Sequence, residues 1–250
     1  MSRILATYNI KGGVGKTSAA VNLSYLAARD GARTLLWDLD PQAGATYLFR
    51  VKPKVRGGGG KLVRLKSDVE DLIKGTDHPG LDLLPADFSY RHMDLALDGF
   101  KHPTRRLARV LEPLTGEYDY VFLDCPPSIS LVSESVFEAA DALLVPVVPA
   151  TLSSRTLEQL EDVVDGGSAG DLRLLPFFSM VDTRKKLHRE VVERVRAERA
   201  GVLEAEIPTS ADVERMGAYR NVLCAFAPRS RAAGAYEALW REVRARVGEG

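Results

Sequence analysis

A glycine-rich run with two lysines lies near the start of the chain, from Ile10 to Ser18. Consecutive glycines allow backbone N–H groups to turn inward around an anion, and a helix that follows directs its positive end at that anion. In such a loop Lys16 neutralises the β- and γ-phosphates of a nucleotide, and the Thr17 hydroxyl ligates Mg²⁺. The run therefore predicts a phosphate-binding loop whose contacts come from Lys11, Gly12, Gly13, Val14, Gly15, Lys16, Thr17 and Ser18.

This loop departs from the common phosphate-loop pattern at one position. The pattern G-x-x-x-x-G-K-[ST] begins with a glycine, where this chain has Ile10, and the chain carries an additional lysine, Lys11. A chance glycine-rich turn is the alternative. The position of the run between an apolar strand pattern and a helix pattern favours the phosphate loop.

Three carboxylates lie at the ends of two predicted strands. Asp38 and Asp40 are two residues apart, so that both face the same side at the end of the strand Thr34–Asp38. Asp124 ends the strand Tyr120–Asp124, where an acid holds Mg²⁺ through water in many nucleotide-binding proteins. Ligands bind at the carboxyl ends of parallel strands. We therefore expect Thr17, Asp40 and Asp124 at the metal, while a purely structural capping role is the alternative, strongest for Asp38.

Strand and helix patterns alternate along the whole chain, which is typical of parallel strands covered by helices. The prediction is one α/β domain over residues 1–250: a doubly wound, mostly parallel sheet with helices on both faces, of the P-loop NTPase type. The predicted strands are Arg3–Tyr8, Thr34–Asp38, Leu81–Leu84, Tyr120–Asp124, Ala142–Val148, Arg173–Ser179 and Leu203–Ile207, with helices that include Thr17–Asp30, Arg105–Leu111, Leu187–Ala200 and Ala232–Val247.

The final predicted helix carries an apolar stripe at helical spacing, made of Tyr236, Leu239, Trp240, Val243 and Val247. A helix that packs on the core and a helix that lies on a membrane surface both produce such a stripe. The core-packing interpretation is favoured. No apolar run approaches the roughly 18 residues that a membrane-spanning helix needs, so we expect no stable membrane anchor.

The segment 51–66 contains six basic residues, no acidic residues and four consecutive glycines. It predicts a mobile basic loop. A solvated surface loop is one interpretation, and a contact with phosphate or with a partner is the other.

Composition limits the function classes. Apolar residues make up 45% of the 250 and charged residues 27%, as in an ordinary globular protein, and this excludes collagen-like, coiled-coil and wholly disordered chains. The 34 basic residues balance 34 acidic ones, so any nucleic-acid contact must come from a local patch. One such patch lies at residues 184–199. Two cysteines, Cys125 and Cys224, are too few for a disulfide framework.

The phosphate loop, the stretch Asp38–Gln42 and the stretch Asp124–Ser128 together resemble the ParA/MinD family of deviant Walker-A ATPases, and most of all short ParA proteins of the Soj type. The resemblance continues through Asp182–Arg184, Ile207–Pro208 and Pro228–Arg231 and so covers nearly the whole chain.

This resemblance implies roles for individual residues. Lys11 matches the family's signature lysine, which reaches the phosphates of the other subunit in an ATP-bound dimer. Asp40 matches the carboxylate that positions the attacking water, and Asp38 is its switch neighbour. Pro208 and Ser210 fall in the loop on the adenine side.

The resemblance also implies a function. We expect an ATPase that is weak alone and stimulated by a ParB-like or cargo adaptor protein, forms a homodimer with ATP and Mg²⁺, and is cytoplasmic and nucleoid-associated. The dimer would bind double-stranded DNA non-specifically and position a plasmid, a chromosome or a protein body. A second DNA-binding position of the family is Asp212 here. The expected DNA contacts are therefore Arg184, Lys185, Lys186, Arg215 and Arg220.

Two other functions occur on this scaffold. A MinD-like membrane-associated regulator is disfavoured because the chain lacks an added basic amphipathic tail. A metabolic enzyme or electron donor is the other alternative. An iron–sulfur relative needs paired cysteines, and the surroundings of Cys125 and Cys224 in the sequence do not indicate a ligand pair.

Overall fold

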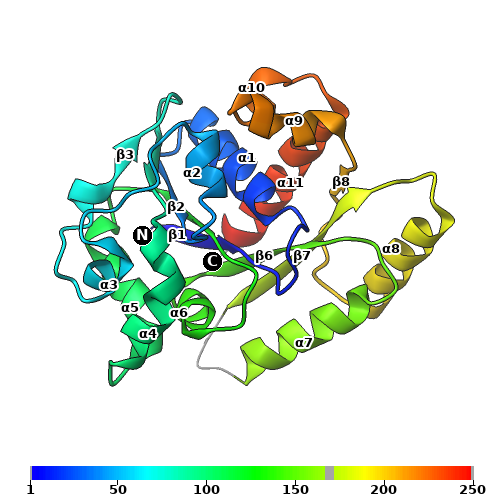
Figure 1. Ribbon diagram of the computed structural model, residues 1–250. Coiled ribbons are helices and arrows are strands. Elements are labelled where there is room, and N and C mark those ends of the chain that lie inside the picture. Colours follow the sequence, from blue (N-terminus) through cyan, green and yellow to red (C-terminus); the bar gives the residue numbers. More distant parts are fainter. Residues whose placement is uncertain (1, 167–171, 249–250) are drawn as a thin grey trace.

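All eight strands belong to one sheet in the computed structural model, which describes residues 2–166 and 172–248 (Figure 1). Their order is β3-β4-β2-β5-β1-β6-β7-β8, and only the edge strand β3 runs antiparallel to its neighbour among the described pairs. The predicted doubly wound α/β fold is confirmed. The strands are β1 Arg3–Thr7, β2 Thr34–Asp38, β3 Lys74–Gly75, β4 Leu81–Leu84, β5 Tyr120–Asp124, β6 Ala142–Val147, β7 Arg173–Val181 and β8 Glu206–Pro208.

Helices cover both faces of this sheet because successive strand residues point to opposite sides. On β1, Leu5 packs into one core and Ala6 into the other. The core of Leu5 is closed by α1 Lys16–Arg29, α2 Gly44–Leu48, α9 Ala211–Tyr219, α10 Leu223–Phe226 and α11 Arg231–Gly248. The core of Ala6 is closed by α3 Gly58–Val63, α4 Met93–Asp98, α5 Arg106–Leu111, α6 Leu131–Ala139, α7 Ser153–Asp165 and α8 Lys186–Glu198.

The bounds of β2, β4 and β5 agree with the predicted strands. These strands lie inside the sheet, and nearly all of their residues are buried; only Asp82 of β4 and Tyr120 of β5 are half-buried. The predicted strand Leu203–Ile207 is wrong at its start. Leu203 is buried and its N–H donates to Pro176 at 2.8 Å, but β8 begins only at Glu206.

The segment 51–66, predicted as a loop, contains the short helix α3. Gly57 and Gly58 have φ values of 86° and 68°, a left-handed backbone that glycine adopts without steric cost. Leu62 and Val63 of α3 are buried in the core. Burial of these two side chains therefore produces a helix despite the poor helix propensity of four glycines.

The apolar stripe of α11 packs on the core, as favoured from the sequence. Tyr236, Leu239, Trp240, Val243 and Val247 are each at most 2% exposed. The Trp240 ring meets the Tyr120 ring edge-on at 5.1 Å, and its Nε1 donates to Asp30 at 3.1 Å. This stripe is therefore not available to a membrane surface. Within residues 2–166 and 172–248, no helix combines the length and the hydropathy that crossing a bilayer requires.

Candidate nucleotide-binding site

The glycine-rich loop connects β1 to α1 at the carboxyl edge of the sheet. Its entry is fixed by Asn9, whose amide Nδ2 donates to Pro146 at 2.8 Å and whose Oδ1 accepts from the Lys11 N–H at 2.9 Å. Asn9 is 3% exposed. Asn9 is not among the site residues predicted from the sequence, where the available signal is a polar side chain directly after an apolar strand pattern.

The exit of the loop brings backbone close to other elements. Gly13 and Gly15 have φ values of 70° and 97°. A Cβ at Gly15 would come within 2.8 Å of the Ser179 Oγ on β7, so this position requires glycine. At Gly13 a Cβ would meet no atom within 4 Å, which leaves open space beside the loop. No side chain caps the start of α1, so its first N–H groups stay available for an anion.

The Lys16 side chain lies along the inside of the loop. It is 6% exposed, and its Nζ donates to the Lys11 carbonyl at 2.9 Å. Burial lowers the pKa of Lys16, while the negative charges of Asp124 and Asp40 act in the opposite direction. A buried ammonium group next to carboxylates in an open loop is suited to neutralising phosphate oxygens.

Asp124 lies beneath this loop, at the end of the central strand β5. It is aligned in the sheet with Thr7 of β1 and Asp38 of β2 and is fully buried. Its Oδ2 atom has no hydrogen-bond partner among the described residues. Burial, and then the charge of Asp38, raises the pKa of Asp124 well above its ordinary value, while the nearby Thr17 hydroxyl lowers it. A buried carboxylate oxygen without a partner, close to a hydroxyl, fits a Mg²⁺ site that phosphates complete.

Asp38, in contrast, is fully satisfied by its neighbours. Its Oδ2 accepts from the Thr46 N–H at 2.8 Å and from the Thr46 hydroxyl at 2.7 Å, and its Oδ1 accepts from the Asp40 N–H at 3.2 Å. Burial raises the pKa of Asp38 to about 6. The carboxylate connects the end of β2 to α2 and fixes the backbone of Asp40.

Asp40 and Lys11 have side chains that are more accessible than those of Asp124 and Lys16. Asp40 is half-buried, and its Oδ1 accepts from the Gln42 N–H at 2.9 Å. Lys11 is exposed, on a backbone that Asn9 and Lys16 hold in place. The loop, Asp38, Asp40 and Asp124 thus lie on adjacent segments at one edge of the sheet.

Pro208 and Ser210 lie farther along that edge. Pro208 ends β8, which is three positions from β1 in the strand order. Ser210 is the N-cap of α9, and its Oγ accepts from the Asp212 N–H at 3.2 Å. Their predicted place on the adenine side stays a prediction.

Four of the five residues expected to bind DNA already have partners within the chain. The Arg184 guanidinium forms two hydrogen bonds with Asp182, and these bonds lower the pKa of Asp182 to about 2. Lys185 has no ion-pair partner among the described residues. The other three contacts are Lys186 with Glu190 at 3.2 Å, Arg215 with Asp212 at 3.7 Å, and the Arg220 Nε with the Tyr47 carbonyl at 3.0 Å.

Comparison with known proteins agrees with this geometry. A family model described as "AAA domain" matches residues 2–167, which include the loop, Asp38, Asp40 and Asp124. The sporulation initiation inhibitor protein Soj of Bacillus subtilis is 33% identical over 98% of this chain and 99% of that protein. The chromosome partitioning protein ParA of Myxococcus xanthus is 31% identical over 98% of this chain and 89% of that protein.

A solved structure is also similar over the full length. It is described as cobyrinic acid a,c-diamide synthase from Mycobacterium smegmatis with bound ADP and magnesium. Its TM-score is 0.85 at 27% identity, and the match covers 100% of this chain and 97% of the other.

Proposed function

The chain belongs to the AAA domain family, as an ATPase of the ParA/MinD type, and from this premise we propose that it is an ATP-driven switch that dimerises, binds DNA and is reset by hydrolysis. The observation that carries the proposal is the unpartnered, buried Asp124 oxygen beneath a phosphate loop that contains a buried lysine. Its cofactors are ATP and Mg²⁺. The similar solved structure contains ADP and magnesium.

The loop N–H groups and Lys16 would hold the phosphates, and Thr17 and Asp124 would lie at the metal. Mg²⁺, when bound, supplies positive charge to the β- and γ-phosphate oxygens. Asp40 orients the attacking water, and its half-buried position at the end of β2 supports this role. Asp38 holds Asp40 through the backbone contact described above and acts as the switch residue.

Lys11 connects hydrolysis to dimer formation in this proposal. Its side chain is exposed on a loop with a fixed backbone, so it can extend to the phosphates held by a second subunit. A cation that reaches developing charge only in the dimer acts as an arginine finger does. The ATPase is therefore slow as a monomer and faster when an adaptor protein stabilises the productive dimer.

The ATP-bound dimer binds double-stranded DNA through its phosphates, without reading sequence. The ParA relative is described as a chromosome partitioning protein, which supports a role in positioning cargo on nucleoid DNA. The cargo is a plasmid, a chromosome or a protein body, and a ParB-like or cargo adaptor protein triggers release.

The Lys11→Ala variant tests the switch. Single-turnover and steady-state hydrolysis should fall at least about 100-fold, since residues of this kind contribute 10³–10⁵. Binding of a fluorescent ATP analogue to the monomer should stay within about twofold. Lys101→Ala, at an exposed lysine outside the site, is the control. Full turnover by Lys11→Ala would contradict the cross-dimer role.

The similar structure described as a cobyrinic acid a,c-diamide synthase favours a second candidate, an ATP-dependent amidating enzyme. Mass spectrometry of cobyrinic acid incubated with the protein, ATP, Mg²⁺ and glutamine or ammonia tests it. Amide formation would establish this candidate, and unchanged cobyrinic acid would exclude it.

An iron–sulfur electron donor is disfavoured because Cys125 and Cys224 are buried in the two different cores, on opposite faces of the sheet.

A further inference from the structure

The basic segment, residues 51–66, differs from the five residues that the sequence predicts to bind DNA. The difference is whether the cations form ion pairs within the chain. All six of its cations are exposed. None of the six forms an ion pair with any residue in the described ranges 2–166 and 172–248. The cations are Lys52, Lys54, Arg56, Lys61, Arg64 and Lys66.

Hydrogen bonds fix the backbone of this segment at three places. The Asp87 carboxylate accepts from the Val55 N–H at 2.8 Å, and the Ser89 hydroxyl accepts from the Gly59 N–H at 2.9 Å. The Arg106 guanidinium donates twice to the Val63 carbonyl, at 2.8 and 2.6 Å. The six cations therefore project from a backbone that is fixed in place. Because the backbone is fixed, the cations cannot move apart freely, and their positive charges stay close together.

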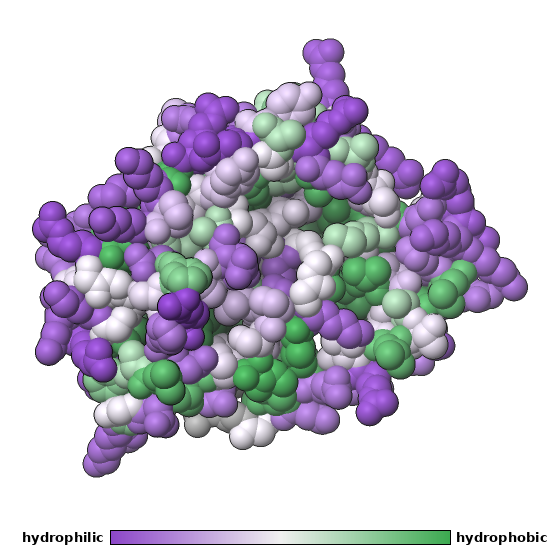
Figure 2. All heavy atoms as spheres, viewed as in Figure 1, coloured by the Kyte–Doolittle hydropathy of each residue, from purple (hydrophilic) through white to green (hydrophobic). Residues whose placement is uncertain are grey.

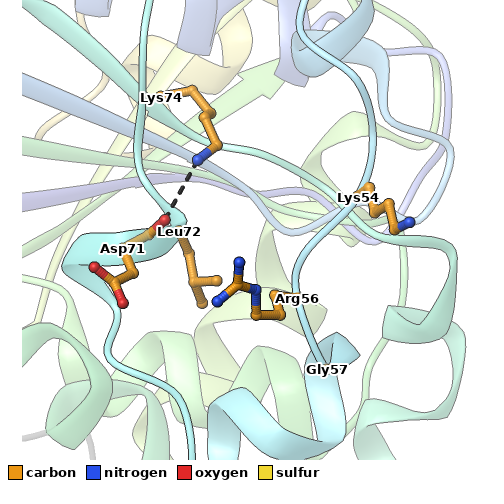
Figure 3. A pocket seen from close by; sticks show the side chains of 6 residues that line it. All are labelled: Lys54, Arg56, Gly57, Asp71, Leu72 and Lys74. Carbon is orange, nitrogen blue, oxygen red and sulfur yellow. Dashed lines mark hydrogen bonds between the residues drawn. The ribbon is translucent and has the colours of Figure 1, made fainter.

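Three cations surround a pocket of about 570 Å³ between this segment and β3. It is lined by Lys54, Arg56, Gly57, Asp71, Leu72 and Lys74. Figure 3 shows the Arg56 guanidinium directed toward Leu72, with the Asp71 carboxylate on the far side of that leucine. Lys74 donates to the Asp71 carbonyl at 3.3 Å, so its contact leaves the charge of the ammonium uncompensated. The lining of the pocket thus carries three cations against one carboxylate, a net positive charge.

The basic segment and the patch at residues 184–199 lie at opposite ends of the molecule. The helix α3 lies on the β3 side of the molecule and α8 lies near the β8 edge (Figure 1). Figure 2 shows hydrophilic side chains gathered at both ends. The two surfaces can therefore be altered independently.

The residue types of the basic segment match a polyanion whose charge is repeated along its length. The segment contains no aromatic side chain and no Asn or Gln, which stack on bases or read their edges. Lysine and arginine alone suit contacts to phosphates, and a row of them suits a duplex backbone better than a single phosphate group.

We propose that the basic segment and Lys74 bind the phosphate backbone of double-stranded DNA, with Lys54, Arg56 and Lys74 at the centre of the contact. This inference rests on the proposed function, because it locates the DNA surface of the same switch. It moves that surface from residues 184–186, where two of the three cations form ion pairs, to the β3 side of the sheet.

The test compares two variants that each remove three positive charges from the full chain. One is Lys54→Gln/Arg56→Gln/Lys74→Gln and the other is Arg184→Gln/Lys185→Gln/Lys186→Gln. Fluorescence anisotropy of a random-sequence duplex is measured with ATP and Mg²⁺ between about 50 and 200 mM salt, the range over which phosphate contacts weaken most visibly. Binding of a fluorescent ATP analogue verifies that both variants are folded.

The pocket variant should lose at least about tenfold in DNA affinity, and the slope of log K against log salt should become shallower by about 2 to 3, since each phosphate contact contributes about 0.9. The slope of the other variant should change by less than about 1.

The reverse pattern, or equal affinity of the pocket variant and the wild type, would overturn the inference while leaving the switch intact. Polyglutamate and unlabelled duplex are also compared as competitors. If polyglutamate displaces the labelled DNA at the same concentration of negative charge as unlabelled duplex does, the inference is overturned in favour of an acidic protein partner. Absence of DNA binding by the wild type in any nucleotide state would instead overturn the proposed function.

Discussion

At the scale of single residues, the site is defined by three carboxylates whose surroundings differ. Asp38 has three donors, Asp124 has an oxygen without a partner, and Asp40 is half-buried with one donor. These differences predict different roles: Asp38 holds structure, Asp124 is ready for a cation, and Asp40 is accessible to a reacting water.

Replacement of Asp40 by alanine should abolish turnover without loss of ATP binding. A group that positions or deprotonates the attacking water contributes about 10²–10⁴ to the rate, so hydrolysis should fall by at least about 100-fold. Asp68→Ala is a matched control, because Asp68 accepts from the Glu70 N–H at 3.2 Å just as Asp40 accepts from Gln42. Unchanged phosphate release by Asp40→Ala would refute the role.

Asp38 should make stability depend on pH in the absence of Mg²⁺ and nucleotide. Its pKa is raised from 3.8 to about 6 in the folded chain, so folded Asp38 keeps its proton where the unfolded chain loses it. The free energy of unfolding should therefore decrease as pH rises from about 4 to 6, by at most about 3 kcal/mol from this group. Urea unfolding of the wild type and Asp38→Asn across this range measures the effect. Parallel curves would contradict the assignment.

The places of the glycine-rich loop and of the three strand-end acids in the fold could be predicted from the sequence, because the motif spacing and the strand ends determine where they lie. Asn9 could not be identified from spacing, since its role depends on the Pro146 carbonyl of β6, a strand far along the chain. The ion pairs of Lys186 and Arg215 likewise depend on side-chain geometry that a motif does not contain.

At the scale of elements, the residue propensities of α3 and the burial of its side chains favour different secondary structures. Its glycines predict a loop, and its buried Leu62 and Val63 produce a helix. The long-range bonds from Asp87, Ser89 and Arg106 could not be read from the segment itself. In β2 and β5 the apolar run and the burial agree, and there the predicted bounds are confirmed.

Helix α11 provides a test of element packing. Trp240→Ala should cost about 3 to 5 kcal/mol of unfolding free energy, since it removes a large buried side chain and leaves a cavity. Arg241→Ala, on the exposed face of the same helix, should cost at most about 0.5 kcal/mol. Chemical denaturation measures both. Sedimentation of the wild type with vesicles, together with a Trp240→Ala protein that keeps wild-type stability but does not sediment, would reverse the interpretation.

At the scale of the whole molecule, the sheet separates the phosphate loop from two basic surfaces at its opposite ends. The phosphate loop lies in the middle of the sheet at its carboxyl edge, between β1 and α1. The basic segment lies on the β3 side of the molecule, and the ion-paired patch of α8 lies near the β8 end (Figure 1). Formal charge is zero for the chain, so DNA binding must come from such a local surface and must weaken with salt.

The central claim is that ATP controls DNA binding. It is tested most directly by the affinity of the wild-type protein for random-sequence duplex DNA with ADP or with ATP, each at about 50 and 200 mM salt. The account predicts tight binding with ATP only, which falls by about 10³ or more between the two salt concentrations if six or more phosphates are contacted. Equal binding with ADP and ATP, or no binding with either, would contradict it.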